Sequence, residues 1–548
     1  MQSHSFQKEF IEPIESMGFS RFDLDYWKKP QLFSAFFSGL PDTNVVIQQI
    51  KNRSSFKYRT EISSILKNQY KEFDPQSKVF SQIAKLEQSN TFTVICAHQP
   101  CLLGGPMYWV YKILSVIKLC KILSEQSSDY QFIPVYFSGN EDHDFEEINH
   151  LQIFQNKIVW QEQSGMACGR LPLDGLPSVI LELENLFQRN EKALQFIKKN
   201  RDWIRNSTNY ADYFRHFVNE LFGEHGLIYF NPDDIEAKSL FAPIIAKELL
   251  ESFIFQNTLD TNSGIQSMKY PLQVNPRELN LFYHHSSGRK RIIKKDEKYQ
   301  LVDSELSYSP TEIIQNLKNN PENFSPNVLL RPLYQEYLFP NLAFIGGGGE
   351  IAYWMQLKNC FDAASIPYPI LFRRFSAFYF DESILAKISK LPIERLTFLQ
   401  PIHEIEKLFI KLQSNEEDNI DQDIQAINGL LDKIQKKGDS LDASTKSSIE
   451  SELQKINKSL EHIFSKRNKV LKQKHEQDLQ NIRKIKEILF PSNTMQERAQ
   501  SFLPYYFKYG IDFFNLIEDC YEPNLARLGL LMENTTDLQK RSVNSKEE

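Results

Sequence analysis

The stretch from Thr93 to His150 constrains the fold more than any other part of the sequence. It contains an apolar run, a turn with two glycines, a segment of helical periodicity that ends near Leu123, and a second apolar run from Phe132 to Phe137. This order is typical of two parallel strands joined by a helix. Ligands bind beyond the carboxyl ends of such strands. Both predicted strand ends carry imidazole, carboxylate or glycine residues, so we expect the functional site there.

Composition narrows the class of protein. The chain has 548 residues, 41% of them hydrophobic and 24% charged, which is enough for a large core with appended units. Its net charge of −6, without a basic block, does not favour binding to nucleic acid or to an anionic membrane. The six cysteines lack CxxC spacing and are typical of reduced thiols. With no signal-peptide pattern and no membrane-length apolar run, we predict a cytoplasmic protein.

The alternation of strands and helices predicts an α/β fold with a Rossmann-like, doubly wound parallel sheet that is interrupted by two inserted connecting segments. We expect the following parts: a mostly helical N-terminal part of the core (1–90), the first half of the core (91–160), a first insertion (161–213), a continuation of the core (214–259), a second insertion (260–324), the second half of the core (325–385), a coiled-coil arm (386–495) and a helical tail that docks on the core (496–548).

The arm is predicted from two series of aliphatic residues that step by three and four positions. They are Ile420, Ile424, Ile427, Leu431 and Ile434, and then Ile449, Leu453, Ile456, Leu460 and Ile463. The turn between them is short, so the two helices must run antiparallel. Such an arm could serve only as a rigid extension, but we favour a homodimer formed through it.

The first predicted strand ends at His98 and Gln99, before Gly104 and Gly105. A helix that begins near Gly104 or Pro106 would direct unpaired amides and its positive dipole end at the turn. An anion could then bind there and accept a hydrogen bond from His98. The alternative is a tight turn in which His98 caps the chain locally.

The second predicted strand ends in the run Glu141 to Asp144, which includes Asp142 and His143. These groups could bind an amine or a divalent ion, or act as a general base. The alternative is a solvated acidic loop. A zinc or iron site with His150 is conceivable, but the seven-residue spacing from His143 matches no tight ligand pattern, so we predict no metal.

A third predicted strand ends in the glycine run from Gly346 to Gly349, before Glu350. The run lacks the lysine of a Walker loop. Together with Arg331 and Gln335 it could form the second half of one ligand crevice, or it could be a packing turn. Arg373 and Arg374 end the last predicted strand and could neutralise a phosphate or carboxylate, or form surface salt bridges.

These motifs carry a resemblance to a known family. Four motifs of this chain resemble, in the same order, those of the bacillithiol biosynthesis cysteine-adding enzyme family. They are the run His98 to Tyr108, the run Glu141 to Asn149, the group Ser325 to Asn327 with Arg331, Pro332 and Gln335, and the run Gly349 to Trp354. With the arm and the tail, the resemblance covers nearly the whole chain.

The resemblance implies a Rossmann-like core with two connecting insertions and a coiled coil that forms a dimer. It also implies a ligase that joins L-cysteine to glucosaminyl-malate in the last step of bacillithiol synthesis. A free carboxylate is a poor electrophile, so we expect ATP to activate the cysteine carboxyl. The His98 turn and the amides of Gly104 and Gly105 would then stabilise the phosphate, and Asp142, His143 or Asp144 would deprotonate the amine.

We therefore expect catalytic roles for His98, Asp142, His143 and Asp144. The residues expected to bind substrate or nucleotide are Gln99, Gly104, Gly105, Tyr108, Glu141, Asn149, Arg331, Gln335, Gly348, Gly349, Glu350, Tyr353 and Arg373. Two other hypotheses remain open. One is a metal-dependent hydrolase that uses His143, Asp144 and His150, and the other is a non-catalytic dimeric scaffold whose coiled coil is the functional part.

Overall fold

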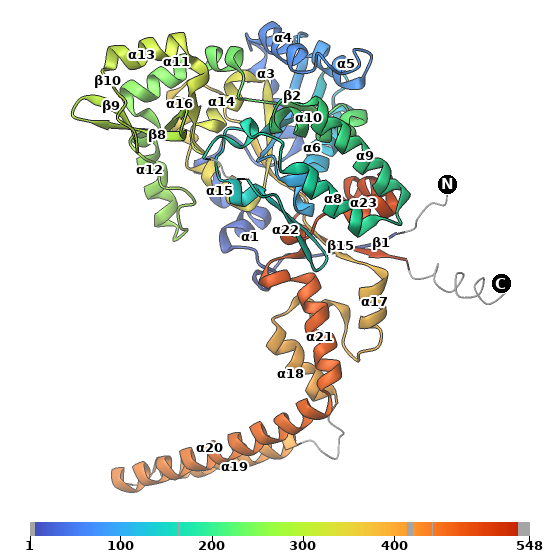
Figure 1. The fold of residues 1–548 in the computed structure, drawn as a ribbon. Helices are drawn as coiled ribbons and strands as arrows, with labels where there is room; N and C mark the ends of the chain where they lie inside the picture. Colours follow the sequence, from blue (N-terminus) through green and yellow to red (C-terminus); the bar gives the residue numbers. More distant parts are fainter. Residues whose placement is uncertain (1–5, 163–164, 414–419, 441, 535–548) are drawn as a thin grey trace, which may run out of the picture. The chain divides into compact units, whose positions relative to one another are not determined.

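The computed structural model describes residues 6–162, 165–413, 420–440 and 442–534 (Figure 1). Contacts divide the chain into two compact units. The first consists of Met1–Phe378 and Gln496–Leu531, and the second of Tyr379–Met495 and Met532–Glu548. Among the described residues, no helix has the length and apolar character needed to cross a membrane.

A five-stranded parallel sheet lies in the first unit. Its strands are β2 (Thr91–His98), β3 (Gln131–Ser138), β6 (Ile228–Phe230), β12 (Asn341–Gly346) and β13 (Ile370–Arg373), and their order is β13-β12-β2-β3-β6. The chain runs outward from β2 to β6 and then returns to the other side of β2. The predicted doubly wound sheet is confirmed, and its switch point lies between β2 and β12.

The apolar runs form strands of this sheet because both of its faces are covered. Every residue of β2 before His98 is buried, and so is every residue of β3 after Gln131. Helix α6 (Met107–Gln126) joins β2 to β3 and packs on both strands. Its apolar residues occur on all sides, which is typical of a helix buried in the core.

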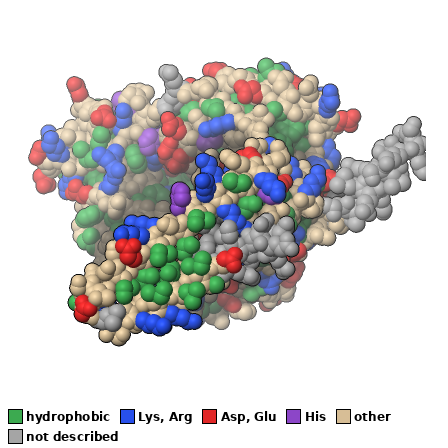
Figure 2. Space-filling view, turned by 90° about the horizontal axis from the view of Figure 1, so that it is seen from below, with side chains coloured by type: hydrophobic (Ala, Val, Ile, Leu, Met, Phe, Trp, Pro, Cys, Tyr) green, Lys and Arg blue, Asp and Glu red, His purple; other side chains and the backbone are tan. Residues whose placement is uncertain are grey.

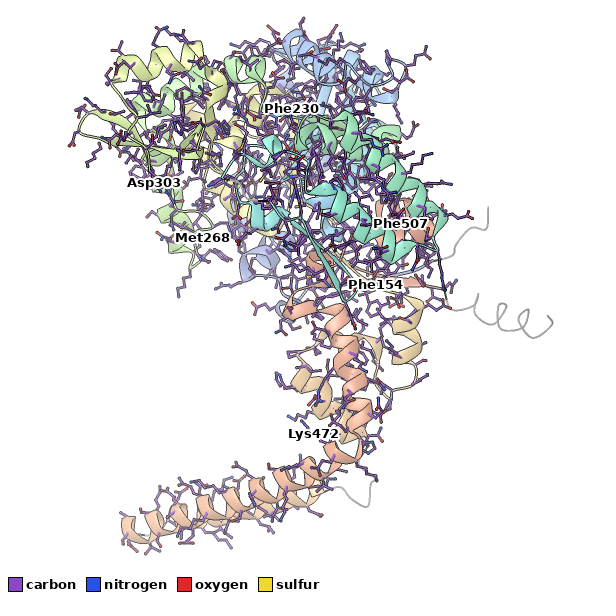
Figure 3. The ribbon with its side chains drawn as sticks, in the orientation of Figure 1. Phe154, Phe230, Met268, Asp303, Lys472 and Phe507 are labelled. Atoms are coloured by element: carbon purple, nitrogen blue, oxygen red, sulfur yellow. The ribbon has the colours of Figure 1, made fainter. Side chains whose placement is uncertain are left out.

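The segment that follows β3 leaves the sheet earlier than we expected. Instead of continuing the core to residue 160, it forms an antiparallel hairpin of β4 (His150–Ile153) and β5 (Asn156–Val159). Phe154 at the hairpin turn has a φ of 52° and an exposed side chain (Figure 3). Three helices then complete the first insertion: α8 (Leu176–Phe187), α9 (Glu191–Asn206) and α10 (Tyr210–Phe222).

The second insertion follows α11 (Ile235–Glu251) and α12 (Phe253–Ser267). Its strands are β7 (Leu281–His285), β8 (Gly288–Lys295), β9 (Lys298–Leu301), β10 (Ser307–Tyr308) and β11 (Phe324–Pro326), in the order β10-β9-β8-β7-β11, with α13 (Pro310–Asn319) between β10 and β11. Ser325 and Pro326 pair with β7, so they belong to this sheet and not to the second half of the core. The core resumes at α14 (Arg331–Leu338) and continues through α15 (Gly348–Met355) and α16 (Lys358–Ala363).

The two ends of the chain add to the first unit. Before β2 lie α1 (Arg21–Lys28), α2 (Thr43–Gln48), α3 (Ile50–Arg53), α4 (Arg59–Gln69) and α5 (Lys78–Lys85). The tail contributes α22 (Gln496–Ala499), α23 (Leu503–Tyr509), α24 (Ile511–Cys520) and β15 (Leu528–Glu533), and β15 pairs with β1 (Phe6–Ile11).

The tail packs on the core through its aromatic side chains. Phe502 stacks on Trp109 of α6 at a centroid distance of 6.0 Å, and the ring centroids of Phe507 and Phe196 lie 5.5 Å apart. Figure 3 labels Phe507. We expected a helical tail, but its described part also contains the strand β15.

The α-helices of the second unit, among its described residues, are α17 (Glu382–Ile388), α18 (Ile402–Leu412), α19 (Ile420–Gly438), α20 (Ala443–Lys474) and α21 (Glu476–Leu489). Helices α19 and α20 form the antiparallel hairpin that the short turn predicted. Gly438 lies against Ile449, and Leu431 and Leu453 are buried.

The hairpin buries only some of the aliphatic residues of the two predicted series. Ile434, Ile456 and Ile463 are 48%, 42% and 53% exposed. The side chains of Ile420 and Ile424 lie outside the described residues. Figure 2 shows hydrophobic side chains gathered on one face of the arm. Two helices alone therefore cannot cover all the aliphatic residues of the two series.

Candidate active site

A cavity of about 950 Å³ lies at the carboxyl ends of β2, β3 and β12, where the order of the strands reverses. His98 and Gln99 line it from the end of β2, the loop from Glu141 to His143 from the end of β3, and the start of α15 from the end of β12. The second insertion contributes a further wall, which includes Phe282 and Arg289.

Most of the expected site residues come together in this cavity. Those that line it are His98, Gln99, Tyr108, Glu141, Asp142, His143, Arg331, Gly348, Gly349, Glu350 and Tyr353. Those outside its lining are Gly104, Gly105, Asp144, Asn149, Gln335 and Arg373. The predicted strand ends therefore line the cavity, but residues next to each other in the sequence differ in whether their side chains face it.

Gly104 and Gly105 do not offer their amides to a ligand, contrary to our expectation. The amide of Gly104 donates to the carbonyl of Cys101 and that of Gly105 to the carbonyl of Leu102, both at 2.9 Å. The first amide of α6, at Met107, donates to the carbonyl of Gln500 at 2.8 Å. The returning tail therefore covers the helix end that we expected to bind an anion.

Three other expected residues have partners within the protein. Arg373 donates from Nε and Nη2 to the buried carboxylate of Asp23, at 2.8 and 3.1 Å. Buried Gln335 accepts a hydrogen bond from Nη1 of Arg331 at 3.2 Å, so it orients Arg331 instead of contacting a ligand. The oxygen of Asn149 lies 3.2 Å from Nδ1 of its neighbour His150.

Asp144, expected to be catalytic, is exposed outside the cavity. Arg374, the neighbour of Arg373, lines the cavity instead. Its guanidinium lies over the ring of Tyr108 at 5.0 Å and pairs with Glu497 at 2.7 Å.

His98 is held as a neutral ring without a free donor. Its Nδ1 lies 3.0 Å from the carbonyl of Gln99, which can only accept, so Nδ1 carries the proton. Its Nε2 then accepts the hydroxyl proton of Tyr108 at 2.8 Å. Burial, reinforced by the charge of Lys112, lowers the pKa of His98 to about 4. We expected His98 to donate a hydrogen bond to an anion. In this arrangement both of its ring nitrogens have partners within the protein, and His98 orients Tyr108.

Asp142 is a fixed carboxylate. It accepts hydrogen bonds from the amide of Gln99 at 2.7 Å and from the backbone N–H of His143 at 2.8 Å. Burial alone would raise its pKa, but these hydrogen bonds and the nearby Arg289 hold the pKa of Asp142 well below its usual range. Asp142 can therefore bind an ammonium group, but it is too weak a base to deprotonate one readily.

Glu141 belongs to a buried ionic cluster beneath the cavity. The ammonium of Lys238 lies 2.7 Å from Glu141 and 2.8 Å from Asp233, and Arg170 also pairs with Asp233 at 2.6 Å. Within the described ranges, Glu141, Asp233 and His284 form the one group whose ligand atoms are close enough to hold a metal ion. Lys238 already supplies a positive charge to both carboxylates, so this cluster is balanced without a metal.

Lys112 and Glu350 meet at the switch point. Lys112 is buried in α6 and donates to the carbonyl of Ala97 at 3.0 Å and to Glu350 at 2.5 Å. Glu350 also accepts the amide of Gly347 at 2.9 Å. Burial would raise the pKa of Glu350, but the charge of Lys112 holds it below its usual value. The pair links the ends of β2 and β12 across the cavity floor.

Sequence reasoning missed several cations of the site. The additional residues are Lys112, Lys238, Arg277, Arg289, Arg291 and Arg498. A signal existed for Lys112, a single charge inside the apolar stretch from Val110 to Ile117. No spacing connects the arginines of β8 with the strand ends, because only the pairing of β7 with β8 brings them to the cavity.

The cavity thus offers carboxylates and arginines in one space. Asp142 and Glu147 both accept hydrogen bonds from Gln99, at 2.7 Å each, and form an acidic side. Arg331, Arg374 and Arg498 add positive charge. Such a site can hold a molecule that carries both an ammonium group and carboxylate or phosphate groups.

Two family models, both from one protein family, together match nearly the whole chain. The family model for the N-terminal Rossmann-like domain of the bacillithiol biosynthesis protein BshC matches residues 9–375, and the model for its C-terminal coiled-coil domain matches residues 377–526.

Three relatives are described as "Putative cysteine ligase BshC". The protein of Christiangramia forsetii is 33% identical over 93% of this chain and 96% of its own length. The protein of Flavobacterium psychrophilum is 34% identical over 94% of this chain and 97% of its own length. A more distant relative from Bacillus cereus is 26% identical over 86% of this chain and 90% of its own length.

Proposed function

The chain belongs to the BshC family of bacillithiol biosynthesis. From that membership we propose that the protein joins L-cysteine to glucosaminyl-malate through an amide bond. The observation that carries the proposal is the charge of the cavity at the switch point, where Asp142 and Glu147 lie in one space with Arg331 and Arg374. Glucosaminyl-malate has an amine and two carboxylates, and cysteine has one of each. Both substrates therefore need a site of mixed charge.

We propose that the acidic side receives an ammonium group and that the arginines receive carboxylates. Asp142 is held ionised and fixed by Gln99, so it can accept hydrogen bonds from an ammonium group without rearrangement. Arg331 is oriented by Gln335 and by Tyr353, whose hydroxyl accepts from Nη2 at 2.9 Å. An arginine held in this way can bind a carboxylate through two parallel hydrogen bonds.

We also propose ATP as the activating co-substrate, because a free carboxylate reacts too slowly with an amine. The first turn of α15, at Gly348 and Gly349, lines the cavity and can present amides to a phosphate. A methyl group on Gly348 would lie 2.2 Å from Cγ of Asp23, so this turn requires glycine. Arg374 and Arg498 supply positive charge to the same space.

Incubation of the purified protein with cysteine and glucosaminyl-malate tests this reaction. We expect mass spectrometry to detect a product equal to the two substrates minus one water, and only when ATP is present. Omission of glucosaminyl-malate is the control. Equal product without ATP would reject ATP as the activating group, and no product under either condition would count against the ligase function.

The two other functions have less support. Among the described residues, His143 and His150 do not belong to one cluster of metal-ligating groups. The metal-dependent hydrolase therefore lacks support for the metal site that it requires. The scaffold does not explain a cavity lined by so many charged groups. The six cysteines are all buried and free, in keeping with our proposal of a cytoplasmic enzyme.

We propose that the arm forms a homodimer. Leu430, Ile434, Ile456 and Ile463 expose between 42% and 58% of their surface in the single chain. Exposed aliphatic residues at heptad spacing are typical of helices that pack against further helices. A second copy of the arm supplies such helices with the same spacing.

Replacement of Ile456 and Ile463 by aspartate is expected to convert the dimer to a monomer. Each buried aliphatic side chain stabilises an interface by roughly 1.5–3 kcal/mol, and a charge in its place would also need desolvation. Sedimentation velocity measures the change, and Ser451→Asp, an exposed position on the same helix, is the control. A double variant that remains dimeric would place the interface elsewhere.

A further inference from the structure

Arg289 holds the imidazole of His143 from one edge. Its Nη1 lies 3.2 Å from Nδ1 of His143. Arg289 itself is buried and fixed, because Nε donates to the hydroxyl of Ser325 at 3.1 Å and Nη2 to the carbonyl of Pro326 at 2.8 Å. Its guanidinium also lies over the ring of Phe282, at 4.0 Å. Arg289 is therefore a rigid neighbour and not a mobile surface group.

This contact determines the tautomer of His143. A guanidinium can only donate hydrogen bonds, so Nδ1 of His143 must accept, and the neutral ring carries its proton on Nε2. Oδ1 of Asp142 is the other group near Nδ1, but it lies 3.6 Å away, which is too far for a hydrogen bond. That oxygen already accepts the backbone N–H of His143.

The remaining edge of the ring is available to a ligand. The side chain of His143 is 40% exposed and lines the cavity. Phe282 contacts the ring at a centroid distance of 5.4 Å. Nothing in the described part of the chain accepts a hydrogen bond from Nε2. His143 thus presents an N–H to the cavity, and its one lone pair is occupied by Arg289.

We propose that His143 is a hydrogen-bond donor to the carboxyl group of cysteine, and that Arg289 is the positioning residue that keeps it in this role. An imidazole whose lone pair is occupied does not remove a proton from the amine, so this inference replaces the base that we expected from the sequence. The neighbouring carboxylate of Asp142 can accept the α-ammonium group. An α-amino acid carries its ammonium and carboxyl groups on one carbon, which matches two adjacent side chains of opposite character.

The inference rests on the proposed function for the identity of the ligand, but the tautomer can be tested without any reaction. In the ¹⁵N spectrum of histidine-labelled protein, we expect His143 to be protonated on Nε2. His98 serves as the internal control, because the carbonyl of Gln99 holds it protonated on Nδ1. His143→Gln and His98→Gln assign the two signals. A proton on Nδ1 of His143 would overturn the inference.

A pair of substitutions separates a donor from a base. The amide of glutamine can donate a hydrogen bond but cannot accept a proton, whereas leucine can do neither. We expect His143→Gln to remain within about tenfold of the parent in kcat/KM for cysteine. We expect His143→Leu to lose about 10- to 100-fold, which is typical for a lost hydrogen bond to a charged group. Equal, large losses in both variants would identify a base and overturn the proposal.

The two Michaelis constants identify the ligand. We expect His143→Leu to raise KM for cysteine and to leave KM for glucosaminyl-malate near its parent value. An increase only for glucosaminyl-malate, or only for ATP, would overturn the assignment to the cysteine carboxyl. A parent protein that forms no product would refute the proposed function, while the spectrum would still decide the tautomer.

Discussion

Asp142→Asn is expected to lower the rate of product formation by about 10²-fold, the size of effect produced by misplacing a substrate by about 1 Å, without unfolding the protein. The carboxylate accepts from Gln99 of the β2 end and lies 3.6 Å from Arg289 of the second insertion. An asparagine has the same shape, but it loses the charge that attracts an ammonium group. Its NH₂ group could also oppose the donor of Gln99.

Steady-state kinetics and a thermal melt measure the two parts of this prediction. Glu146→Gln is the matched control, because Glu146 is an exposed carboxylate four positions further along the chain, in the short helix α7 (Phe145–Ile148) and outside the cavity lining. Activity of Asp142→Asn within a few-fold of the parent would remove this carboxylate from the mechanism. A large fall in melting temperature would show that its role is structural.

Lys238→Met is expected to destabilise the first unit by about 3–5 kcal/mol, which is typical when one partner of a buried ion pair is removed. Lys238 is 1% exposed and lies between the carboxylates of Glu141 and Asp233. Without its ammonium, Asp233 keeps Arg170. Among the ion pairs of the described residues, Glu141 then keeps the one with His284, whose Nε2 lies 3.5 Å away. A buried carboxylate would then lack a compensating charge.

Thermal unfolding followed by circular dichroism measures the loss. Lys247→Met is the control on the same helix, because the Lys247–Glu251 pair is partly exposed and such surface pairs contribute about 0–1 kcal/mol. Addition of Glu141→Gln to Lys238→Met should restore part of the stability, since it removes the unpaired charge. Equal melting temperatures of the two lysine variants would contradict the buried-cluster interpretation.

The location of the site could be predicted because it depends on local patterns. Continuous apolar runs, such as the one before His98, form parallel strands that are buried on both faces. Residues at the ends of such strands must emerge at one edge of the sheet. His98, Glu141 and Glu350 therefore came together in the structure as the order of strands and helices implied.

The roles of single residues could not be predicted in the same way. Sequence spacing does not show that the carbonyl of Gln500 accepts the first amide of α6, or that Arg373 forms an ion pair with Asp23. Each of these contacts joins residues far apart in the chain. The same holds for Arg289, which reaches His143 from another sheet. Motif reasoning found the neighbourhood of each group but not its partner.

The amino-acid sequence by itself determined the doubly wound sheet, the strand ends that form the cavity and the antiparallel arm, because periodicity and turn length act between near neighbours. The tertiary structure alone decided which charges face the cavity, which amides are already occupied and which groups contact the ring nitrogens of His98 and His143. Those properties depend on burial and on hydrogen-bond partners from distant segments. Gly105 and Arg373 therefore lie outside the cavity lining, and Arg289 and Arg374 lie within it.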